Sequence, residues 1–159
     1  ASSGPHSNGY SLIRKIIELS GADLSAPCGE TTLAEALMAP TEIYNKPLLA
    51  LQREIKPHAL AHITGGGLLE NIPRSLPSGC SAILDKQTWE LPPVFQWLAE
   101  AGGVAEEEMH RTFNCGIGMT IIVGPGKAEA ALQLLSDQGL ICWGLGSITE
   151  GNGVVEFAS

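Results

Sequence analysis

The stretch HITGGGLLENIPR, residues 62–74, places three consecutive glycines between a strand-like run and a helix-like run. Adjacent glycines are costly to order, because glycine loses more backbone freedom on folding than any other residue. At the carboxyl end of a strand and the start of a helix, their N–H groups would attract an anion, helped by the helix dipole. Arg74 at the end of the same helix is a candidate phosphate donor. The alternative is a tight turn whose backbone packs against a neighbouring element.

Hydrophobic spacing on either side of this stretch predicts alternating helices and strands. Apolar residues at Leu12, Ile13, Ile16 and Ile17 have helical spacing and predict a helix over 10–19 that ends at Gly21. The other helices are expected near residues 33–38, 45–55, 67–76, 94–101 and 127–138. The strands are expected at residues 58–64, 80–85 and 118–123, followed by two closing strands, CWGLGSI and VVEF, joined by the turn EGNG.

This order predicts an α/β or α+β fold, with a single mixed sheet and helices packed on it. The 159 residues are enough for one domain with a substantial core, and 44% of them are hydrophobic while 16% are charged. In the third helix Asn45 is expected to cap the N-terminus and Pro47 to lie in the first turn. No internal repeat, low-complexity tract or linker divides the chain.

Composition also excludes several classes of function. A formal net charge of −8, with nine Lys and Arg, argues against a nucleic-acid partner, because phosphate backbones require clustered cations. No uninterrupted apolar window is long enough for a membrane span, and no signal peptide opens the chain. The four cysteines are too far apart for a CxxC site and are typical of reduced core residues. We therefore expect a cytoplasmic protein without a membrane partner.

The opening stretch SSGPHSNG is a second concentration of polar side chains between glycines. These side chains belong to Ser3, His6, Ser7 and Asn8. They can converge on a ligand, and His6 could donate a proton or a hydrogen bond near neutral pH. The alternative is a capping turn with one exposed histidine.

A third such stretch, FNCGIGM, covers residues 113–119. Asn114 offers an amide, and two glycines permit close approach just before a strand. The alternative is a crowded entry into that strand.

Other short patterns carry less weight. GPGK at 124–127 lacks the Walker spacing and the following Ser or Thr, so a strand-to-helix turn is favoured. GIG and GLG lack the third glycine of a dinucleotide fingerprint. His58 and His62 are four residues apart but lack the glutamate of a zinc protease, so a partly exposed structural pair is favoured over a metal site. No metal ligand is expected in this chain.

Taken in order, SSGPHSNGYSL, the PTxIYxK pattern at 40–46, HITGGGLLENIPR and RTFNCGIGM resemble one family across essentially the whole chain. It is the C-terminal domain of phosphoribosylformylglycinamidine cyclo-ligases, also called aminoimidazole ribonucleotide synthetases. The GGG–ENIPR and FNCGIGM motifs are specific to this family. SSGPHSNG is shared in part with formylglycinamidine ribonucleotide synthetase, selenophosphate synthetase, thiamine monophosphate kinase and a hydrogenase maturation protein.

The resemblance implies a reaction of de novo purine synthesis. ATP and Mg²⁺ would activate the formyl amide oxygen of formylglycinamidine ribonucleotide by phosphorylation, and the amidine nitrogen would close the imidazole ring and expel phosphate. It also implies that residues 1–159 are the C-terminal domain of a two-domain enzyme. An N-terminal domain preceding Ala1 would bind most of the ATP and Mg²⁺ and form a homodimer, so the 159 residues alone are expected to fold but not to catalyse.

The resemblance also suggests roles for the candidate residues. His6 and Asn8 would lie near the reacting centre. Thr64, Gly65, Gly66 and Gly67 would form an anion cradle, supported by Asn71 and Arg74. Ser3, Ser7 and Asn114 complete the set expected to bind substrate or phosphate. Two alternatives stay open: another ATP-dependent enzyme of the same superfamily, and a stand-alone phosphometabolite-binding module.

Overall fold

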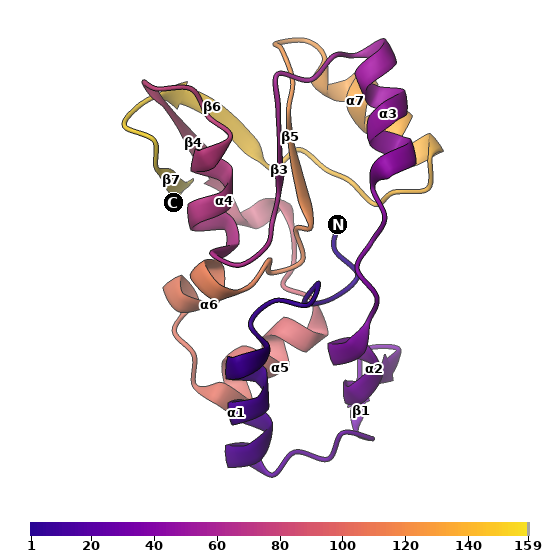
Figure 1. Cartoon of the computed structure of the whole chain (residues 1–159), viewed down its shortest axis with the longest axis vertical. Helices are drawn as coiled ribbons and strands as arrows, with labels where there is room; N and C mark the ends of the chain where they lie inside the picture. Colours follow the sequence, from indigo (N-terminus) through magenta and orange to yellow (C-terminus); the bar gives the residue numbers. More distant parts are fainter. Residues whose placement is uncertain (159) are drawn as a thin grey trace.

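The computed structural model describes residues 1–158 and shows an α+β protein whose helices pack against small sheets (Figure 1). The helices are α1 (Tyr10–Ser20), α2 (Leu33–Met38), α3 (Asn45–Glu54), α4 (Gly67–Arg74), α5 (Pro93–Gly102), α6 (Glu106–Thr112) and α7 (Ala128–Asp137), with a 3₁₀ turn at Lys86–Thr88. The strands are β1 (Pro27–Cys28), β2 (Thr31–Thr32), β3 (Ala59–His62), β4 (Cys80–Asp85), β5 (Met119–Ile122), β6 (Gly146–Glu150) and β7 (Val155–Ala158).

The α+β class is confirmed, but the strands form three separate ladders where one mixed sheet was predicted. β1 pairs with β2, β3 pairs with β5, and β4 lies between β6 and β7. The first two ladders are antiparallel, whereas β4 runs antiparallel to β6 and parallel to β7. Helix α4 connects β3 to β4 and lies between them (Figure 1), which separates the second ladder from the third.

The two closing strands were expected to be neighbours, but β4 lies between them. The turn that joins them instead wraps the start of β4, where Gly151 N–H donates to the Gly79 carbonyl at 2.9 Å and Gly153 N–H to the Cys80 carbonyl at 3.0 Å. β4 is the most buried of the three strands, with Ser81, Ala82 and Leu84 buried and no exposed residue, so pairing on both edges satisfies its backbone groups away from water.

Local signals account for several helix boundaries. α1 buries Ile13 and Ile16 and ends at Gly21, a left-handed C-cap. α2 begins at a capping box formed by Thr32 and Glu35. Pro47 lies in the first turn of α3 as predicted. Asn45, however, is the first helical residue and does not cap the helix.

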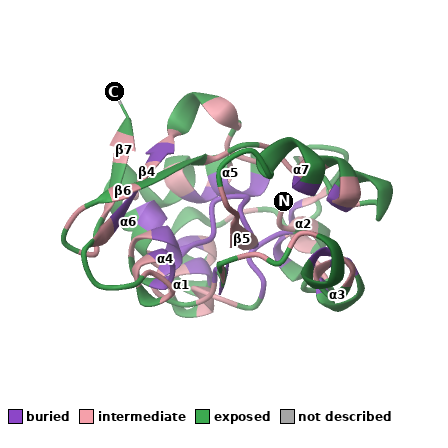
Figure 2. Ribbon diagram, turned by 90° about the horizontal axis from the view of Figure 1, so that it is seen from above, coloured by how far each residue is buried: buried purple, intermediate pink, exposed green. Residues whose placement is uncertain are grey.

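The core consists of three clusters of buried side chains. The largest joins α1, α2, α5 and α6, the second lies around α4 and β4, and the third lies between α3 and α7. Buried residues gather in the middle of the molecule, while the outer faces of α3 and α7 are exposed (Figure 2). None of the helices in residues 1–158 is long and apolar enough to cross a bilayer.

Candidate functional site

The N-terminal loop has an unusual backbone just before α1. His6 and Ser7 both have positive φ angles, 52° and 58°, which non-glycine residues rarely adopt. The amide side chain of Asn8 donates to the His6 carbonyl at 2.7 Å, and the Asn8 backbone N–H donates to the Pro5 carbonyl at 3.1 Å. Such a conformation persists only where its surroundings fix it, and these bonds fix the loop.

His6 is buried, with 4% of its surface exposed, and it joins this loop to the segment before α3. Its Nε2 accepts from the backbone N–H groups of Ser3 at 3.1 Å and Glu42 at 3.4 Å, which assigns the ring proton to Nδ1. Burial, with His62 nearby, lowers the pKa of His6 below its usual value. Nδ1 has no hydrogen-bond partner within residues 1–158. His6 is therefore a neutral, buried group with an unused donor.

Two further rings surround His6. The ring centroids of Tyr44 and His62 each lie 6.2 Å from that of His6 and 6.1 Å from one another. The Tyr44 hydroxyl donates to the Ala1 carbonyl at 2.6 Å. A Cβ atom at Gly118 would lie 2.0 Å from the Tyr44 hydroxyl and 2.7 Å from the His6 ring, so this position requires glycine.

The position of His62 next to His6 was not predicted from the sequence. It is exposed, lies at the end of β3 and faces His6, whereas His58 lies just before the strand. The available signal was its position immediately before ITGGG, a stretch already assigned to the site.

A side chain would meet different surroundings at each of the three glycines after β3. A Cβ atom at Gly67 would lie 2.1 Å from the His110 carbonyl oxygen, so close packing against α6 is sufficient to require glycine here. Gly66 has a φ of 96°, and a Cβ atom there would lie 2.6 Å from the Glu70 carboxylate. Gly65 is open, since its nearest neighbour would be the Asn8 side-chain oxygen at 3.8 Å.

These contacts reduce the number of groups in the predicted anion cradle that are free to bind a ligand. The carboxylate of Glu70 lies beside Gly66, the N-cap of α4, where an anion was expected. Arg74 forms an ion pair with that carboxylate at 2.7 Å and is 62% exposed, so its guanidinium is already paired. Gly65, next to Asn8, is the glycine of this loop that leaves room for a ligand.

Asn71 and Thr64 hold the glycine loop from inside. Asn71 is 8% exposed, and its amide lies within hydrogen-bond distance of the carbonyls of Thr64, Gly65 and Gly67 at 3.3, 3.2 and 2.8 Å. The Thr64 hydroxyl donates to the Asn71 side-chain oxygen at 3.2 Å. In this structure Asn71 fixes the carbonyls of the loop, and its support of a bound anion stays a prediction.

Asn114 has a comparable role for the N-terminal loop. It is fully buried, its oxygen accepts from the Ser2 hydroxyl at 2.8 Å and the Gly116 N–H at 2.9 Å, and its amide donates to the Gly4 carbonyl at 2.8 Å. Asn114 does not reach the surface in this structure. It positions the loop, and the predicted ligand contact would require the loop to open.

The comparisons with known proteins agree with the resemblance. Residues 1–158 match the family described as AIR synthase related protein, C-terminal domain. The chain belongs to this family. It is 59% identical over 150 residues to a phosphoribosylformylglycinamidine cyclo-ligase of Nitrosospira multiformis, and this aligned region covers 94% of the chain and 43% of that relative. It is also 59% identical over 148 residues to the Burkholderia mallei protein of the same name, covering 93% of the chain and 42% of the relative. The chain thus spans less than half the length of these relatives.

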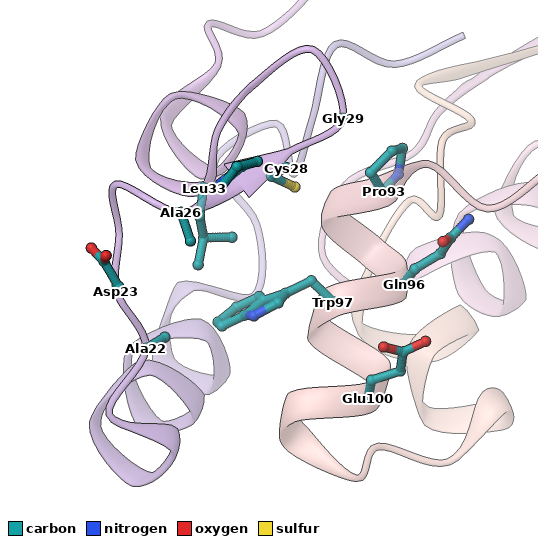
Figure 3. A pocket seen from close by; sticks show the side chains of 11 residues that line it. Ala22, Asp23, Ala26, Cys28, Gly29, Leu33, Pro93, Gln96, Trp97 and Glu100 are labelled. Atoms are coloured by element: carbon teal, nitrogen blue, oxygen red, sulfur yellow. The ribbon is translucent and has the colours of Figure 1, made fainter.

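In this AIR synthase related C-terminal domain, the three motif stretches lie next to one another. Ser2 N–H donates to the Gly116 carbonyl at 2.8 Å, Ile63 N–H donates to the Gly118 carbonyl at 2.9 Å, and Asn8 lies beside Gly65. The exposed groups at the junction belong to Ser3, Ser7, His62 and Gly65. The rest of the junction, including all of residues 113–118, is buried or half-buried. Two cavities of about 310 and 280 Å³ lie elsewhere, and the larger is bordered by Trp97 of α5 (Figure 3). Residues 1–158 contain no group of three His, Cys, Asp or Glu side chains that could hold a metal ion.

Proposed function

We propose that this chain is the substrate-cleft domain of an ATP-dependent cyclo-ligase. The enzyme would convert formylglycinamidine ribonucleotide to aminoimidazole ribonucleotide, ADP and phosphate in de novo purine synthesis. Family membership and 59% identity to proteins named cyclo-ligase support the reaction. The structural observation that carries the proposal is the meeting of residues 1–8, 62–67 and 113–118, where the buried segment 113–118 holds the two loops that expose Ser3, Ser7, His62 and Gly65.

The groups at this surface suit the amidine end of the substrate. The Asn8 amide is committed to the His6 carbonyl, and the Asn8 side-chain oxygen receives no hydrogen bond from residues 1–158. That oxygen is an acceptor for the N–H groups of an amidine. Gly65 beside it lets the substrate approach the backbone. Holding the attacking nitrogen against the activated carbon supplies the proximity on which ring closure depends.

The residues of this chain do not fit a magnesium site. No three candidate ligands gather within residues 1–158, and the carboxylate of Glu70 beside the glycine loop is paired with Arg74. We assign ATP and Mg²⁺ to the part of the enzyme beyond this chain, and we derive no step through them. On this proposal the enzyme is cytoplasmic and homodimeric at full length, and the 159 residues alone are inactive.

The test uses the full-length natural polypeptide and measures ATP-dependent formation of aminoimidazole ribonucleotide. Gly65→Leu should lower kcat/KM by about 100-fold, because a side chain there displaces the substrate from its productive position. The matched control is Gly144→Leu, at an exposed glycine that, like Gly65, has no left-handed φ and whose added Cβ atom would meet open space. The melting temperatures of the Gly65 variant and the wild type should be similar.

Two results would contradict the proposal. A folded wild-type enzyme that binds ATP but yields no product would favour another ATP-dependent reaction of the superfamily. Cyclisation by residues 1–159 alone would show that the ATP site lies within this chain.

A further inference from the structure

Two histidines lie side by side at the junction of the motif stretches, and of these His62 is the one that faces solvent. It ends β3, where its register partner on β5 is Met119. The N–H of the next residue, Ile63, donates to the Gly118 carbonyl at 2.9 Å and fixes the backbone beyond the strand. The His62 ring also lies edge-on to the buried ring of Tyr44, with the two centroids 6.1 Å apart. The fold therefore holds an exposed imidazole at a defined place on the junction.

His6 itself cannot accept a proton without losing bonds that hold its loop. Its Nε2 accepts from the backbone N–H groups of Ser3 at 3.1 Å and Glu42 at 3.4 Å, and its ring proton is on Nδ1. Protonation of Nε2 would break both bonds in a residue that is 4% exposed. His6 is therefore restricted to donating a hydrogen bond.

The other titratable groups of this cluster are also engaged. The Tyr44 hydroxyl donates to the Ala1 carbonyl at 2.6 Å, and burial raises the pKa of Tyr44, so this hydroxyl stays protonated. The carboxylate of Glu42 accepts from the N–H of the next residue at 3.2 Å. The His62 imidazole forms no hydrogen bond within residues 1–158, so it has a free lone pair. His62 is thus the imidazole of the junction that is suited to accept a proton.

His62 and Asn8 are both in direct reach of His6. The Asn8 amide donates to the His6 carbonyl at 2.7 Å, and the centroid of the His62 ring lies 6.2 Å from that of the His6 ring. Gly65, the open glycine beside the Asn8 side-chain oxygen, follows His62 in the same loop. The proposed amidine contact and the free imidazole therefore belong to one small area of the junction.

Ring closure by the function proposed above requires a base in this area. As the bond from the amidine nitrogen to the formyl carbon forms, the bond from that carbon to its phosphorylated oxygen breaks, and the electron pair leaves with phosphate. The attacking nitrogen must then give up a proton before the ring is a neutral imidazole.

We propose that His62 is the general base that takes this proton from the attacking nitrogen. Neutral His6 and Tyr44 hold its ring, and because His62 is exposed it returns the proton to water. This assignment rests on the proposed function and adds to it a catalytic residue.

The experiment measures aminoimidazole ribonucleotide formation by the full-length polypeptide in a single turnover at saturating substrate, so that product release cannot mask the chemical step. His62→Gln should lower this rate by about 100-fold, the lower end of the range for general base catalysis. The half-saturating substrate concentration should change by less than about threefold, because the interaction is made mainly in the transition state.

The matched control is His58→Gln, since His58 is also exposed and lies just before the other end of β3. It should change the rate by less than about twofold. Melting temperatures of both variants should match that of the wild type, and His62→Asn provides a second substitution at the same exposed position.

Two readouts separate proton transfer from a structural role. Histidine side chains change charge between about pH 5 and 8, so the wild-type rate should fall as the pH is lowered through this range, whereas the rate of His62→Gln should stay flat. Free imidazole should restore part of the activity of His62→Ala, because it supplies the missing base.

The outcomes distinguish this inference from the function on which it rests. A folded wild type that forms no product would refute the function and the inference together. An active wild type whose His62 variants lose no more activity than His58→Gln, or keep the wild-type pH profile, would refute the role of His62 and leave the function standing.

Discussion

Replacing Gly67 by alanine is expected to lower the free energy of unfolding by about 2–5 kcal/mol. The backbone of Gly67 has a φ of 56°, a left-handed conformation that costs an alanine about 1–2 kcal/mol. The new Cβ atom would also lie 2.1 Å from the His110 carbonyl oxygen and 2.8 Å from the Phe113 carbonyl oxygen. Both are backbone atoms that cannot rotate away, and overpacking of this kind costs about 1–3 kcal/mol.

Two matched variants separate these contributions. Gly126 has a φ of 76° but open space around it, so Gly126→Ala should show the conformational cost alone, about 1–2 kcal/mol. Gly65 has neither a left-handed φ nor a close neighbour, so Gly65→Ala should change the unfolding free energy by less than about 0.5 kcal/mol. The order of destabilisation should therefore be Gly67, Gly126, Gly65.

The assay is urea unfolding of the 159-residue chain, with thermal unfolding as a second measurement. The Gly67 variant should melt about 4–20 °C below the wild type. If the Gly67 and Gly126 variants were equally destabilised, the contact between the glycine loop and the end of α6 would contribute nothing. The packing explanation for Gly67 would then be wrong.

Three further outcomes are expected. The pKa of His6 is lowered in the folded state, so the stability that neutral His6 contributes should be complete above about pH 6.5 and lost as the pH falls below that value. Urea unfolding of the wild type and of His6→Gln, measured as a function of pH, checks this. Arg74→Ala should cost less than about 1 kcal/mol, since its ion pair with Glu70 is exposed; a large rise in KM of the full-length enzyme would instead show that Arg74 turns to substrate. Asn71→Ala should cost about 1–3 kcal/mol in chemical unfolding, because loop carbonyls lose their donor.

Much of the secondary structure could be predicted because it depends on local signals. The helix over Leu33–Met38 and the strand over Cys80–Asp85 were predicted with the observed bounds. Helix α6 was missed, because EEEMHRT has little apolar periodicity; its only signal is the three glutamates of its first turn, which favour a helix N-terminus. The position of β4 between the closing strands depends on contacts distant in sequence, which local patterns do not contain.

The candidate site shows the same division between local and distant information. That the three motif stretches belong together followed from their resemblance to a family. The carboxylate of Glu70 beside Gly66, the inward bonds of Asn71 and the proximity of His62 to His6 depend on how side chains pack. Consequently the sequence indicated which loops to consider as a candidate site but not which groups within them stay free of contacts in the folded chain.

The position of β4 has a consequence for synthesis on the ribosome. Its two partners, β6 and β7, begin at Gly146 and Val155, whereas β4 ends at Asp85. At a translation rate of about 5–20 residues per second, CSAILD emerges roughly 3–12 s before either partner. During that interval it is an unpaired apolar strand, the kind of segment that templates aggregation. Nascent chains paused after α7 should therefore depend on chaperones more than completed ones do.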